Sequence, residues 1–358
     1  MPPNTFEFYR TSEETWESML VAIRGAQSSI DIEHYIFASD KIGDQFIEIL
    51  KEKSKRGVKI RLLIDTVGSY AFYIGGVPEE LRQLGIQVRF FNPISPWRIP
   101  HFTSWFFRDH KKIIVVDRKI GFTGGLGIRD NMAGWRDTNA RLEGEMVGEM
   151  AESFKETWEQ LGDKNLLSKI KRFRINAKKR FFITNAPYFK KRFLYYAFIE
   201  ALRSARKSIW LTTPYFIPDR RLLRVLRQAV RRGVDVKVIV PTILDVPIVA
   251  TAAHSAFEEL LKGGVKIFKY HPKFLHAKTA VVDDEWATFG SFNFDSLSFV
   301  YNFEANVVST ALECVKELKE HFLEDLGSSF EITLENWMKR PLLRKVQEFF
   351  IAPIRGFL

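Results

Sequence analysis

The stretch LHAKTAVVDDEWATFGSFNFDS, residues 275–296, places a histidine and a lysine in front of a short apolar run. The run is rich in β-prone residues, which predicts a strand, and the acidic residues after it predict a polar turn. If the chain folds back about this turn, residues whose numbers sum to about 568 become neighbours. The predicted hairpin therefore brings the region of Ser291 and Asn293 beside His276 and Lys278.

The four side chains of this hairpin suit an anionic substrate such as a phosphate. Lys278, Ser291 and Asn293 can donate hydrogen bonds to its oxygens. His276 can act as a nucleophile or carry a proton. A single His-x-Lys pattern does not establish this chemistry, because a histidine at a strand end is more often a surface residue or a hydrogen-bonded residue of the core.

A second copy of the pattern lies upstream, in the stretch DHKKIIVVDRKIGFTGGLGIRD at residues 109–130. A histidine, a lysine, an aspartate and a glycine recur there at the same spacing. We expect the aspartates and glycines to have structural roles, with the aspartates in the turns of the two hairpins. The matched pairs are His110 and His276, Lys112 and Lys278, Asp117 and Asp283, and Gly124 and Gly290.

The repeat extends over most of the chain. Each half reads as a helix, an apolar strand, an amphipathic helix that ends near a glycine, a strand, a helix, a strand and the motif hairpin. The first helix has the pattern of a capping box, with Thr11 as the N-cap and Glu14 three positions later. The matching segments outside the motifs are 28–37 with 207–217, 53–65 with 228–241, and 81–91 with 260–270.

This order of elements predicts an α/β fold of two tandem domains, each a mostly parallel sheet covered by helices. The two motif copies are expected to meet in one active site at the interface between the halves. We expect the domains at residues 1–165 and 166–330, separated by a basic linker at 164–182, and a C-terminal segment at 331–358. A hydrophobic content of 46% is enough for a core in each domain.

The doubled His-x-Lys-x4-Asp motif resembles that of the phospholipase D superfamily, so the two domains are expected to be phospholipase D-like. The second copy matches the extended motif as far as Asn293, whereas the first copy reads GGLG at 124–127. Gly125 and Gly127 therefore bring no side-chain donor. A Gly-Gly pair at this place is similar to that of bacterial cardiolipin synthases. Further likeness lies in the stretches IEHYIFASDKIGDQF, WRDTNARLEG, TPYFIPD and YNFEAN, and extends over about residues 8–330.

The resemblance implies a covalent mechanism that requires neither metal nor nucleotide cofactor. One histidine, with His110 favoured, attacks phosphorus to form a phosphohistidine, and the other protonates the departing alcohol and then activates the incoming one. Lys112 and Lys278 would neutralise the oxyanions. The sequence is consistent with this chemistry, since it has one cysteine, no histidine and carboxylate cluster at zinc spacing, and no glycine-rich nucleotide loop.

Two carboxylates are candidates for orienting the histidines. An attacking histidine must present one nitrogen without a proton, and a carboxylate that accepts a hydrogen bond from the other nitrogen fixes that tautomer. Glu304 is the first candidate, because it lies fourteen residues after Gly290, and Asp137 lies thirteen residues after Gly124 in the matching place. The alternative for each carboxylate is a solvated charge at a strand end.

The charge balance favours an anionic partner. A net charge of +11, from 54 basic and 43 acidic residues, suits both nucleic acid and anionic lipid. Lipid is favoured by the aromatic stretch 89–110, where Trp105 and Phe106 are expected to contact the membrane. The basic, amphipathic tail points the same way, with Phe349 and Phe350 on its apolar face. The alternatives are that the aromatic stretch is buried between the lobes and that the tail packs on the body.

We expect peripheral attachment to the bacterial cytoplasmic membrane. No run of the sequence approaches the roughly 18 apolar residues that a spanning helix needs. The start, MPPNTFEFYRTSEE, lacks the apolar region of a signal peptide. Cys314 is the only cysteine, so an internal disulfide is excluded and a reducing compartment is permitted.

Together these features predict a phosphatidyltransferase of the cardiolipin synthase type. One phosphatidylglycerol gives its phosphatidyl group to the enzyme and releases glycerol, and a second phosphatidylglycerol accepts the group. The expected partners are anionic phospholipids, namely phosphatidylglycerol and cardiolipin, and a membrane surface. The alternatives are a phospholipase D hydrolase with water as the acceptor, a nucleic-acid phosphodiesterase, which the aromatic stretch and the tail disfavour, and an inactive membrane scaffold, which the two intact His/Lys pairs disfavour.

Overall fold

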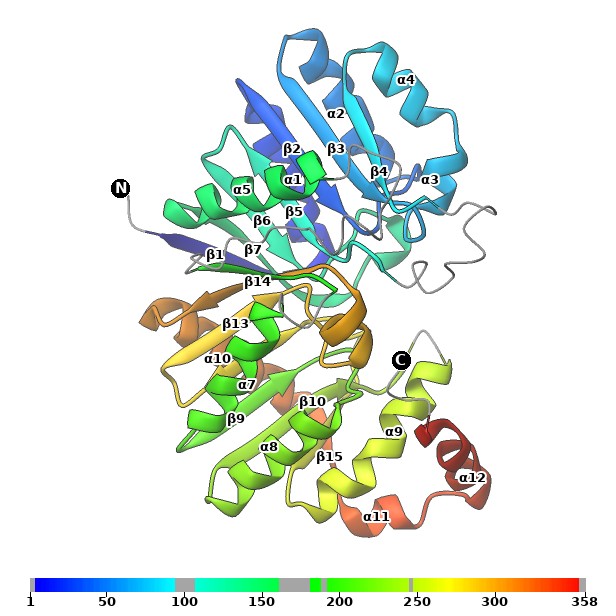
Figure 1. The fold of residues 1–358 in the computed structure, drawn as a ribbon, viewed down its shortest axis with the longest axis vertical. Helices are drawn as coiled ribbons and strands as arrows, with labels where there is room; N and C mark the ends of the chain where they lie inside the picture. Colours follow the sequence, from blue (N-terminus) through cyan, green and yellow to red (C-terminus); the bar gives the residue numbers. More distant parts are fainter. Residues whose placement is uncertain (1–3, 94–106, 161–180, 188–191, 245–246, 354–358) are drawn as a thin grey trace.

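The chain folds into two halves that lie one above the other, each a sheet with helices on both faces (Figure 1). The computed structural model describes residues 4–93, 107–160, 181–187, 192–244 and 247–353. The expected domain boundary at 165/166 and most of the expected basic linker lie outside the described residues. The two halves follow the predicted repeat in sequence order.

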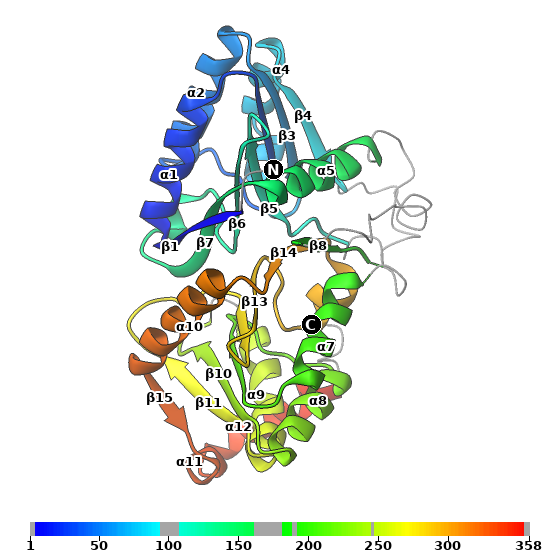
Figure 2. The same cartoon turned by 90° about the vertical axis from the view of Figure 1, so that its left-hand side faces the viewer.

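The first half is a seven-stranded sheet in the order β1-β7-β6-β5-β2-β3-β4. Helices α1 and α2 cover one face of this sheet, and α5 covers the other (Figure 2). The strands are β1 Thr5–Thr11, β2 Ser29–His34, β3 Lys59–Asp65, β4 Gln87–Phe91, β5 Lys112–Val116, β6 Ile120–Gly124 and β7 Arg136–Glu143. The helices are α1 Ser12–Gly25, α2 Gly43–Lys55, α3 Tyr70–Ile74, α4 Val77–Gln83 and α5 Glu145–Gln160.

Alternation along the motif strand explains how both faces of this sheet are filled. Ile114 and Val116 pack with α1 and α2, whereas Ile113 and Val115 pack with α5. An apolar run without polar interruption is what a strand buried on both faces requires. The predicted capping box of α1 is confirmed, because the Thr11 side chain accepts from the Glu14 backbone N–H and the Glu14 carboxylate accepts from the Thr11 N–H.

The second half is an eight-stranded sheet in the order β15-β11-β10-β9-β12-β13-β14-β8. Helices α7, α8 and α9 share the core on one face, and α10 covers the other. The strands are β8 Phe182–Asn185, β9 Ser208–Thr212, β10 Asp235–Pro241, β11 Lys266–Tyr270, β12 Thr279–Val282, β13 Trp286–Gly290, β14 Glu304–Ser309 and β15 Ser329–Ile332. The helices are α7 Phe193–Ser204, α8 Arg220–Arg231, α9 Pro247–Lys262, α10 Leu312–Gly327, α11 Leu334–Met338 and α12 Leu342–Ile351. Because β15 ends at Ile332, this sheet continues past the expected boundary at 330.

The sheets are mixed, which corrects the expectation that they are mostly parallel. Among the strands of the described residues, only β2-β3-β4 and β9-β10-β11 pair in parallel. The motif hairpins, β5-β6 and β12-β13, and the strands beside them pair antiparallel. A hairpin needs only a short turn, whereas a parallel pair needs a crossover, so two strands joined by a tight turn run in opposite directions.

The predicted register of the second hairpin is confirmed, with Thr279 opposite Phe289 and Ala280 opposite Thr288. The motif strands also run antiparallel to the central strands of their sheets. Lys112, the first residue of β5, therefore lies opposite His34 at the carboxyl end of β2. Both motifs thus begin at the edge of the sheet where the parallel strands end, which is where α/β sheets place ligand sites.

The two aspartates that end the motifs lie in the hairpin turns, at positive φ of 53° and 55°. Asp117 accepts from the backbone N–H groups of Gln27, Ser28 and Ser29, at 2.7–2.9 Å. Asp283 makes the matching contacts with residues 206–208. Burial raises the pKa of each carboxyl, but the backbone donors outweigh it and leave the pKa below its usual value. Each aspartate thus ties its motif turn to the loop before the central strand.

A buried ion pair and a shared core join the halves. The Asp325 carboxylate of α10 accepts from Arg136 Nε and Nη2 of β7 at 2.8 and 2.7 Å, and from Arg10 of β1 at 3.1 Å. One hydrophobic cluster contains Ile113 and Val115 of the first half together with residues of β12, β13 and β14. The interface between the halves is therefore largely apolar, like the interior of a domain. Within it lies the bidentate ion pair between Arg136 and Asp325.

We predict that Asp325→Asn lowers the free energy of unfolding by about 3–5 kcal/mol, because it leaves the buried Arg136 without its counter-charge and removes one of the two carboxylates that pair with Arg10. Urea or thermal unfolding of the purified protein measures this change. The matched control is Asp284→Asn, which removes a carboxylate paired with Lys319 at the exposed surface, and its expected cost is below about 1 kcal/mol. Equal costs for the two variants would contradict the role given to the buried pair.

Candidate active site

Each histidine of the repeated motif contacts a carboxylate of the opposite half. His110 Nδ1 lies 3.0 Å from Glu304 Oε1, and His276 Nδ1 lies 2.8 Å from Asp137 Oδ2. Both carboxylates are fully buried. Since an ionised carboxylate only accepts hydrogen bonds, Nδ1 is the donor in each pair, and Nε2 of the neutral imidazole keeps its lone pair.

Backbone hydrogen bonds across the interface produce this crossing. The His110 N–H donates to the carbonyl of Phe303 at 2.9 Å, and Phe303 immediately precedes Glu304. In the other direction, the His276 N–H donates to the carbonyl of Arg136 at 2.8 Å, and Arg136 precedes Asp137. Each motif therefore runs beside the start of the carboxylate strand of the other half. The two copies form one site, and in the described parts of the chain neither half contains a histidine–carboxylate pair of its own.

The two motif lysines place positive charge in the same buried space. Lys112 Nζ donates to the His110 carbonyl at 2.9 Å, and Lys278 Nζ donates to the His276 carbonyl. Burial, followed by the charge of Lys278, lowers the pKa of Lys112 to about 7. An anion bound between the two ammonium groups would offset both effects and stabilise the charged form.

Both histidines are neutral near pH 7. Burial, with the charge of Lys278, lowers the pKa of His276 to about 4. Burial also lowers the pKa of His110, although the negative charge of Glu304 acts in the opposite direction. Burial raises the pKa of Glu304 and Asp137 as well, but the neighbouring cations and hydrogen bonds outweigh it and leave both values below normal. The site thus holds two neutral imidazoles, each fixed by an ionised carboxylate.

The structure gives Ser291 a different partner from the one expected from the sequence. Its Oγ donates to Glu304 Oε2, and Ser298 Oγ donates to Oε1 at 2.7 Å, so Ser291 holds the carboxylate instead of facing a substrate. Asn293 is buried, and among the described residues its side-chain oxygen has no hydrogen-bond partner. This unused atom is an acceptor, so it can receive a hydrogen bond from a hydroxyl group but cannot donate one to an oxyanion.

Steric hindrance explains why the first motif copy has glycine at positions 125 and 127. A Cβ at Gly125 would lie 2.5 and 2.6 Å from the two carboxylate oxygens of Asp137, so the serine of the second copy has no room there. A Cβ at Gly127 would lie 2.9 Å from Ile36 Cβ. The shorter Asp137 approaches the backbone directly, whereas Glu304 reaches the other histidine with hydroxyl groups around it.

Two asparagines that the sequence analysis missed hold the motif glycines in place. Asn139 Oδ1 accepts from the Leu126 N–H at 3.1 Å, and Asn306 Oδ1 accepts from the Phe292 N–H at 3.1 Å. A Cβ on Gly124 or Gly290 would overlap these amide oxygens. The available signal was an asparagine two residues after each carboxylate, in DTN and EAN.

Aromatic rings and a third histidine also border the site. Tyr35 lies edge-on to the His110 ring with centroids 4.9 Å apart, and Trp135 lies 4.9 Å from the His276 ring. His34 is 1% exposed, and its ring nitrogens have no hydrogen-bond partner among the described residues. Burial lowers the pKa of His34 to about 3. The rings of Tyr35 and Trp135 restrict how the imidazoles of His110 and His276 can turn.

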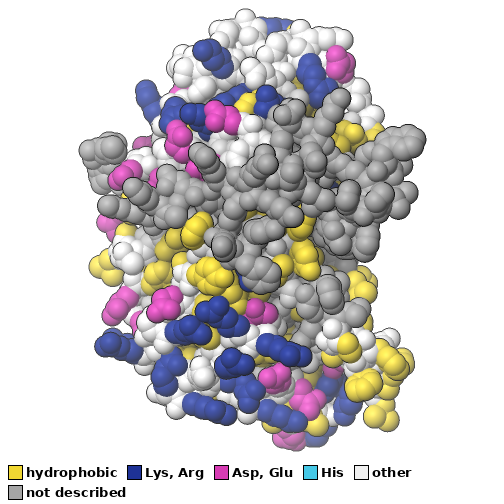
Figure 3. Space-filling view, viewed as in Figure 1, with side chains coloured by type: hydrophobic (Ala, Val, Ile, Leu, Met, Phe, Trp, Pro, Cys, Tyr) yellow, Lys and Arg dark blue, Asp and Glu magenta, His cyan; other side chains and the backbone are white. Residues whose placement is uncertain are grey.

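The predicted membrane contacts are only partly described. Trp105 and Phe106 lie outside the described residues. Phe349 and Phe350 on α12 are 75% and 71% exposed, and Figure 3 shows hydrophobic side chains gathered over this helix. None of the helices in the described ranges combines the length and apolar character of a membrane-spanning helix. The same ranges contain no cluster of histidine, cysteine and carboxylate side chains arranged to hold a metal ion.

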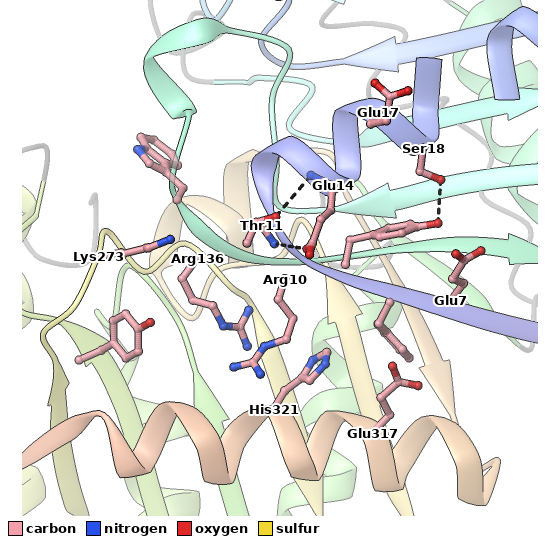
Figure 4. A pocket seen from close by; sticks show the side chains of 14 residues that line it. Glu7, Arg10, Thr11, Glu14, Glu17, Ser18, Arg136, Lys273, Glu317 and His321 are labelled. Carbon is pink, nitrogen blue, oxygen red and sulfur yellow. Dashed lines mark hydrogen bonds between the residues drawn. The ribbon is translucent and has the colours of Figure 1, made fainter. Parts of the chain in front are cut away.

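A separate pocket of about 850 Å³ lies at the interface near Trp135 (Figure 4). Arg10, Arg136, Lys273 and His321 line it, but none of the motif residues does. Asp325 already accepts hydrogen bonds from both arginines. The groups that could attract an anion are therefore largely neutralised, and the reactive groups lie elsewhere.

The similarities to known proteins agree with this geometry. A family model described as "Cardiolipin synthase, PLD-like domain" matches residues 19–158 and 198–326. The cardiolipin synthase of Geobacillus kaustophilus is 36% identical over 352 residues, which are 94% of this chain and 69% of that protein. The probable cardiolipin synthase YwiE of Bacillus subtilis is 34% identical over 370 residues, 98% of this chain and 71% of that protein.

A solved structure shows the same fold. Phosphatidylserine synthase from Haemophilus influenzae superposes with a TM-score of 0.77 at 14% sequence identity, over 99% of this chain and 95% of that one. The resemblance of the doubled motif to the phospholipase D superfamily is thereby confirmed. With a matching model over both halves and relatives at this identity, the chain belongs to the family of cardiolipin synthases with phospholipase D-like domains.

Proposed function

We propose that this protein synthesises cardiolipin by transferring a phosphatidyl group from one phosphatidylglycerol to another. The observation that carries the proposal is the pair of neutral, carboxylate-oriented imidazoles that two buried lysines accompany in one site. Phosphodiester exchange between alcohols needs one nucleophile, one proton carrier and fixed positive charge. The chain supplies all three from its own side chains.

The reaction divides into two displacements at phosphorus. In the first, Nε2 of one histidine, which we take to be His110, forms a P–N bond while the P–O bond to glycerol breaks. The other histidine, His276, acts in its imidazolium form: with the anionic phosphodiester bound beside it, Nε2 takes up a proton from solvent and then gives that proton to the departing glycerol oxygen. In the second, the hydroxyl of another phosphatidylglycerol loses its proton to His276 and attacks phosphorus, and the P–N bond breaks. Each step exchanges one bond at phosphorus for another.

The buried lysines favour an anionic substrate over an empty site. Burial, and after it the charge of Lys278, lowers the pKa of Lys112 to about 7, so the charged form of Lys112 is disfavoured in the site. A phosphodiester between the two lysines supplies negative charge, and the charge that develops during attack is stabilised by the same groups. We assign Lys112 and Lys278 to this role, and we assign Asn293 Oδ1 to accepting a hydrogen bond from a hydroxyl group of the substrate.

We further propose that the protein acts as a peripheral enzyme on the bacterial cytoplasmic membrane, with phosphatidylglycerol and cardiolipin as its lipid partners. The net charge of +11 supports attraction to an anionic surface. The exposed rings of Phe349 and Phe350 support insertion at the headgroup level. Expected energies of about 1.5–3 kcal/mol per buried side chain are enough for reversible attachment.

The direct test is to incubate the purified protein with phosphatidylglycerol vesicles and to resolve the products by mass spectrometry. We expect cardiolipin and glycerol in equal amounts. Phosphatidic acid as the main lipid product would instead identify a hydrolase with water as the acceptor. Cleavage of single-stranded DNA without turnover of lipid would contradict the proposal and favour a nucleic-acid phosphodiesterase.

We predict that His110→Ala and His276→Ala each lower turnover by several orders of magnitude, and that the double variant loses little more, since both histidines serve one reaction cycle. Radiolabelled phosphatidylglycerol provides the sensitivity that these rates require. If either single variant kept near wild-type turnover, the two-histidine mechanism would be wrong for this protein. The matched control is His271→Ala, since His271 is a histidine outside both motifs, and it should retain full activity.

A second prediction concerns the carboxylates. Glu304→Gln removes the negative charge that raises the pKa of His110 against burial, so the pKa of His110 should fall further. Asp137→Asn should have the same effect on His276 and leave His110 nearly unchanged. NMR titration of the imidazole signals measures both values, and turnover should fall by about 10²–10⁴-fold. An unchanged pKa at His110 in the Glu304 variant would show that the crossed pair does not form in solution.

A further inference from the structure

Corresponding connections in the two halves leave apolar side chains in contact with water. After β3, the first half exposes Val67, Tyr70 and Ile74. After β10, the second half exposes Ile243 and Ile248. Ile74 and Ile243 are 63% and 74% exposed. Val67 and Ile243 each follow their strand by two residues, so the duplication repeats the feature in the same place.

These connections lie at the edge of the sheets where the reactive histidines lie. β3 and β10 run parallel to β2 and β9, so all four strands end at this edge of their sheets. The last residue of β3, Asp65, accepts a hydrogen bond from the N–H of Asp109, which adjoins His110. In the second half, the last residue of β9, Thr212, lies opposite Thr279, which adjoins Lys278. The five exposed apolar residues therefore flank the site from both halves.

Helix α12 adds a larger apolar surface beside the second group. It packs along α9, the helix that carries Ile248, and Arg340 holds it there by ion pairs with Glu258 of α9 and Glu348 of α12. One side of the tail helix α12 therefore packs on the body, as one of the two alternatives for the tail expected. Its other side stays exposed, so that side remains available for contact with a membrane. Its exposed apolar residues are Leu342, Leu343, Val346, Phe349 and Phe350. In Figure 1, α3 and α12 lie on the same side of the molecule.

A basic helix, α8, lies in the same half, on the other side of α9 from α12. Arg220, Arg224, Arg227 and Arg231 recur along α8 at spacings of three and four residues, which places them on one face of the helix. Among the described residues, only Arg227 of these four has an ion pair, with Glu259. Figure 3 shows Lys and Arg side chains over α8 on the same face as the hydrophobic side chains over α12, and Figure 1 shows α9 between these two helices.

We propose that the apolar residues after β3 and β10, together with α12, form one docking face for an anionic phospholipid bilayer. The proposal rests on the proposed function, because it assigns the surface through which that site takes its lipid. The arginines of α8 complement the charge of phosphatidylglycerol headgroups. Docked in this way, the enzyme turns the edge that carries His110 and His276 toward the bilayer, where phosphodiesters lie at the level of the headgroups.

The test uses single labelled cysteines as reporters of lipid contact. The native Cys314 is buried and 1% exposed, and burial raises the pKa of its thiol to about 12, so it should not react with a thiol-specific dye. Ile74→Cys, Ile243→Cys and Phe349→Cys place an environment-sensitive dye on the proposed face. With phosphatidylglycerol vesicles, the emission of all three should shift to shorter wavelength.

The matched controls are Val21→Cys and Leu312→Cys, which are 56% and 74% exposed. Val21 lies near Asp117, at the opposite edge of the sheets, and Leu312 follows β14, which starts at the site and runs away from it. Their emission should not change. A response at the controls equal to that at the three face positions, or no response at those positions while the protein cosediments with vesicles, would overturn the proposal.

An affinity measurement complements the dyes. Ile74→Ser combined with Ile243→Ser should weaken binding to phosphatidylglycerol vesicles by about tenfold or more, and Val21→Ser combined with Leu312→Ser should leave it unchanged. Thermal unfolding of each variant checks that the fold is retained. Dye responses to single-stranded DNA but not to vesicles would also overturn the docking face.

The dye experiment tests the docking face independently of the proposed reaction. If the dyes respond but no cardiolipin forms, the proposed function fails and the docking face stands. If cardiolipin forms while the dyes stay silent, the docking face fails and the function stands.

Discussion

The crossed contact between each imidazole and the carboxylate of the opposite half is the interaction on which the rest of this structure depends. His110 needs Glu304 and His276 needs Asp137, and in each case the two residues lie on different sheets. The backbone bonds from His110 to Phe303 and from His276 to the residue before Asp137 make the crossing possible. Anything that shifts one half against the other therefore misaligns both histidines at once. The buried ion pairs and shared core of the interface serve catalysis as much as stability.

Charge balance makes such a site tolerable inside a protein. An isolated buried charge costs several kcal/mol, but here two carboxylates and two lysines lie together. For Lys112, burial and the charge of Lys278 outweigh the carboxylates, so its pKa is lowered to about 7. The negative charge of a phosphodiester would stabilise the charged form of Lys112, so the two lysines suit an anionic substrate. The same burial keeps the histidines neutral and able to attack.

The duplicated halves reach the same geometry with different side chains. In one half, Glu304 is surrounded by the hydroxyl groups of Ser291 and Ser298. In the other, the shorter Asp137 lies against Gly125, where a side chain would collide with it. The length of the carboxylate and the size of the residue in the motif have thus changed together. The first copy has Gly125 in place of the serine of the full motif because the Asp137 carboxylate occupies the space that a side chain would need.

The sequence by itself determined the repeat, the capping box at Thr11, the hairpin register around Thr279 and the family, because all of these depend on the spacing of residues close together in the chain. It also identified Glu304 and Asp137 as candidate partners of the histidines by their matching positions. Only the tertiary structure decided that the sheets are mixed, that the carboxylates cross between the halves and that Ser291 donates to Glu304. These features depend on strand direction and on contacts between residues up to about two hundred positions apart, for which local periodicity carries no signal.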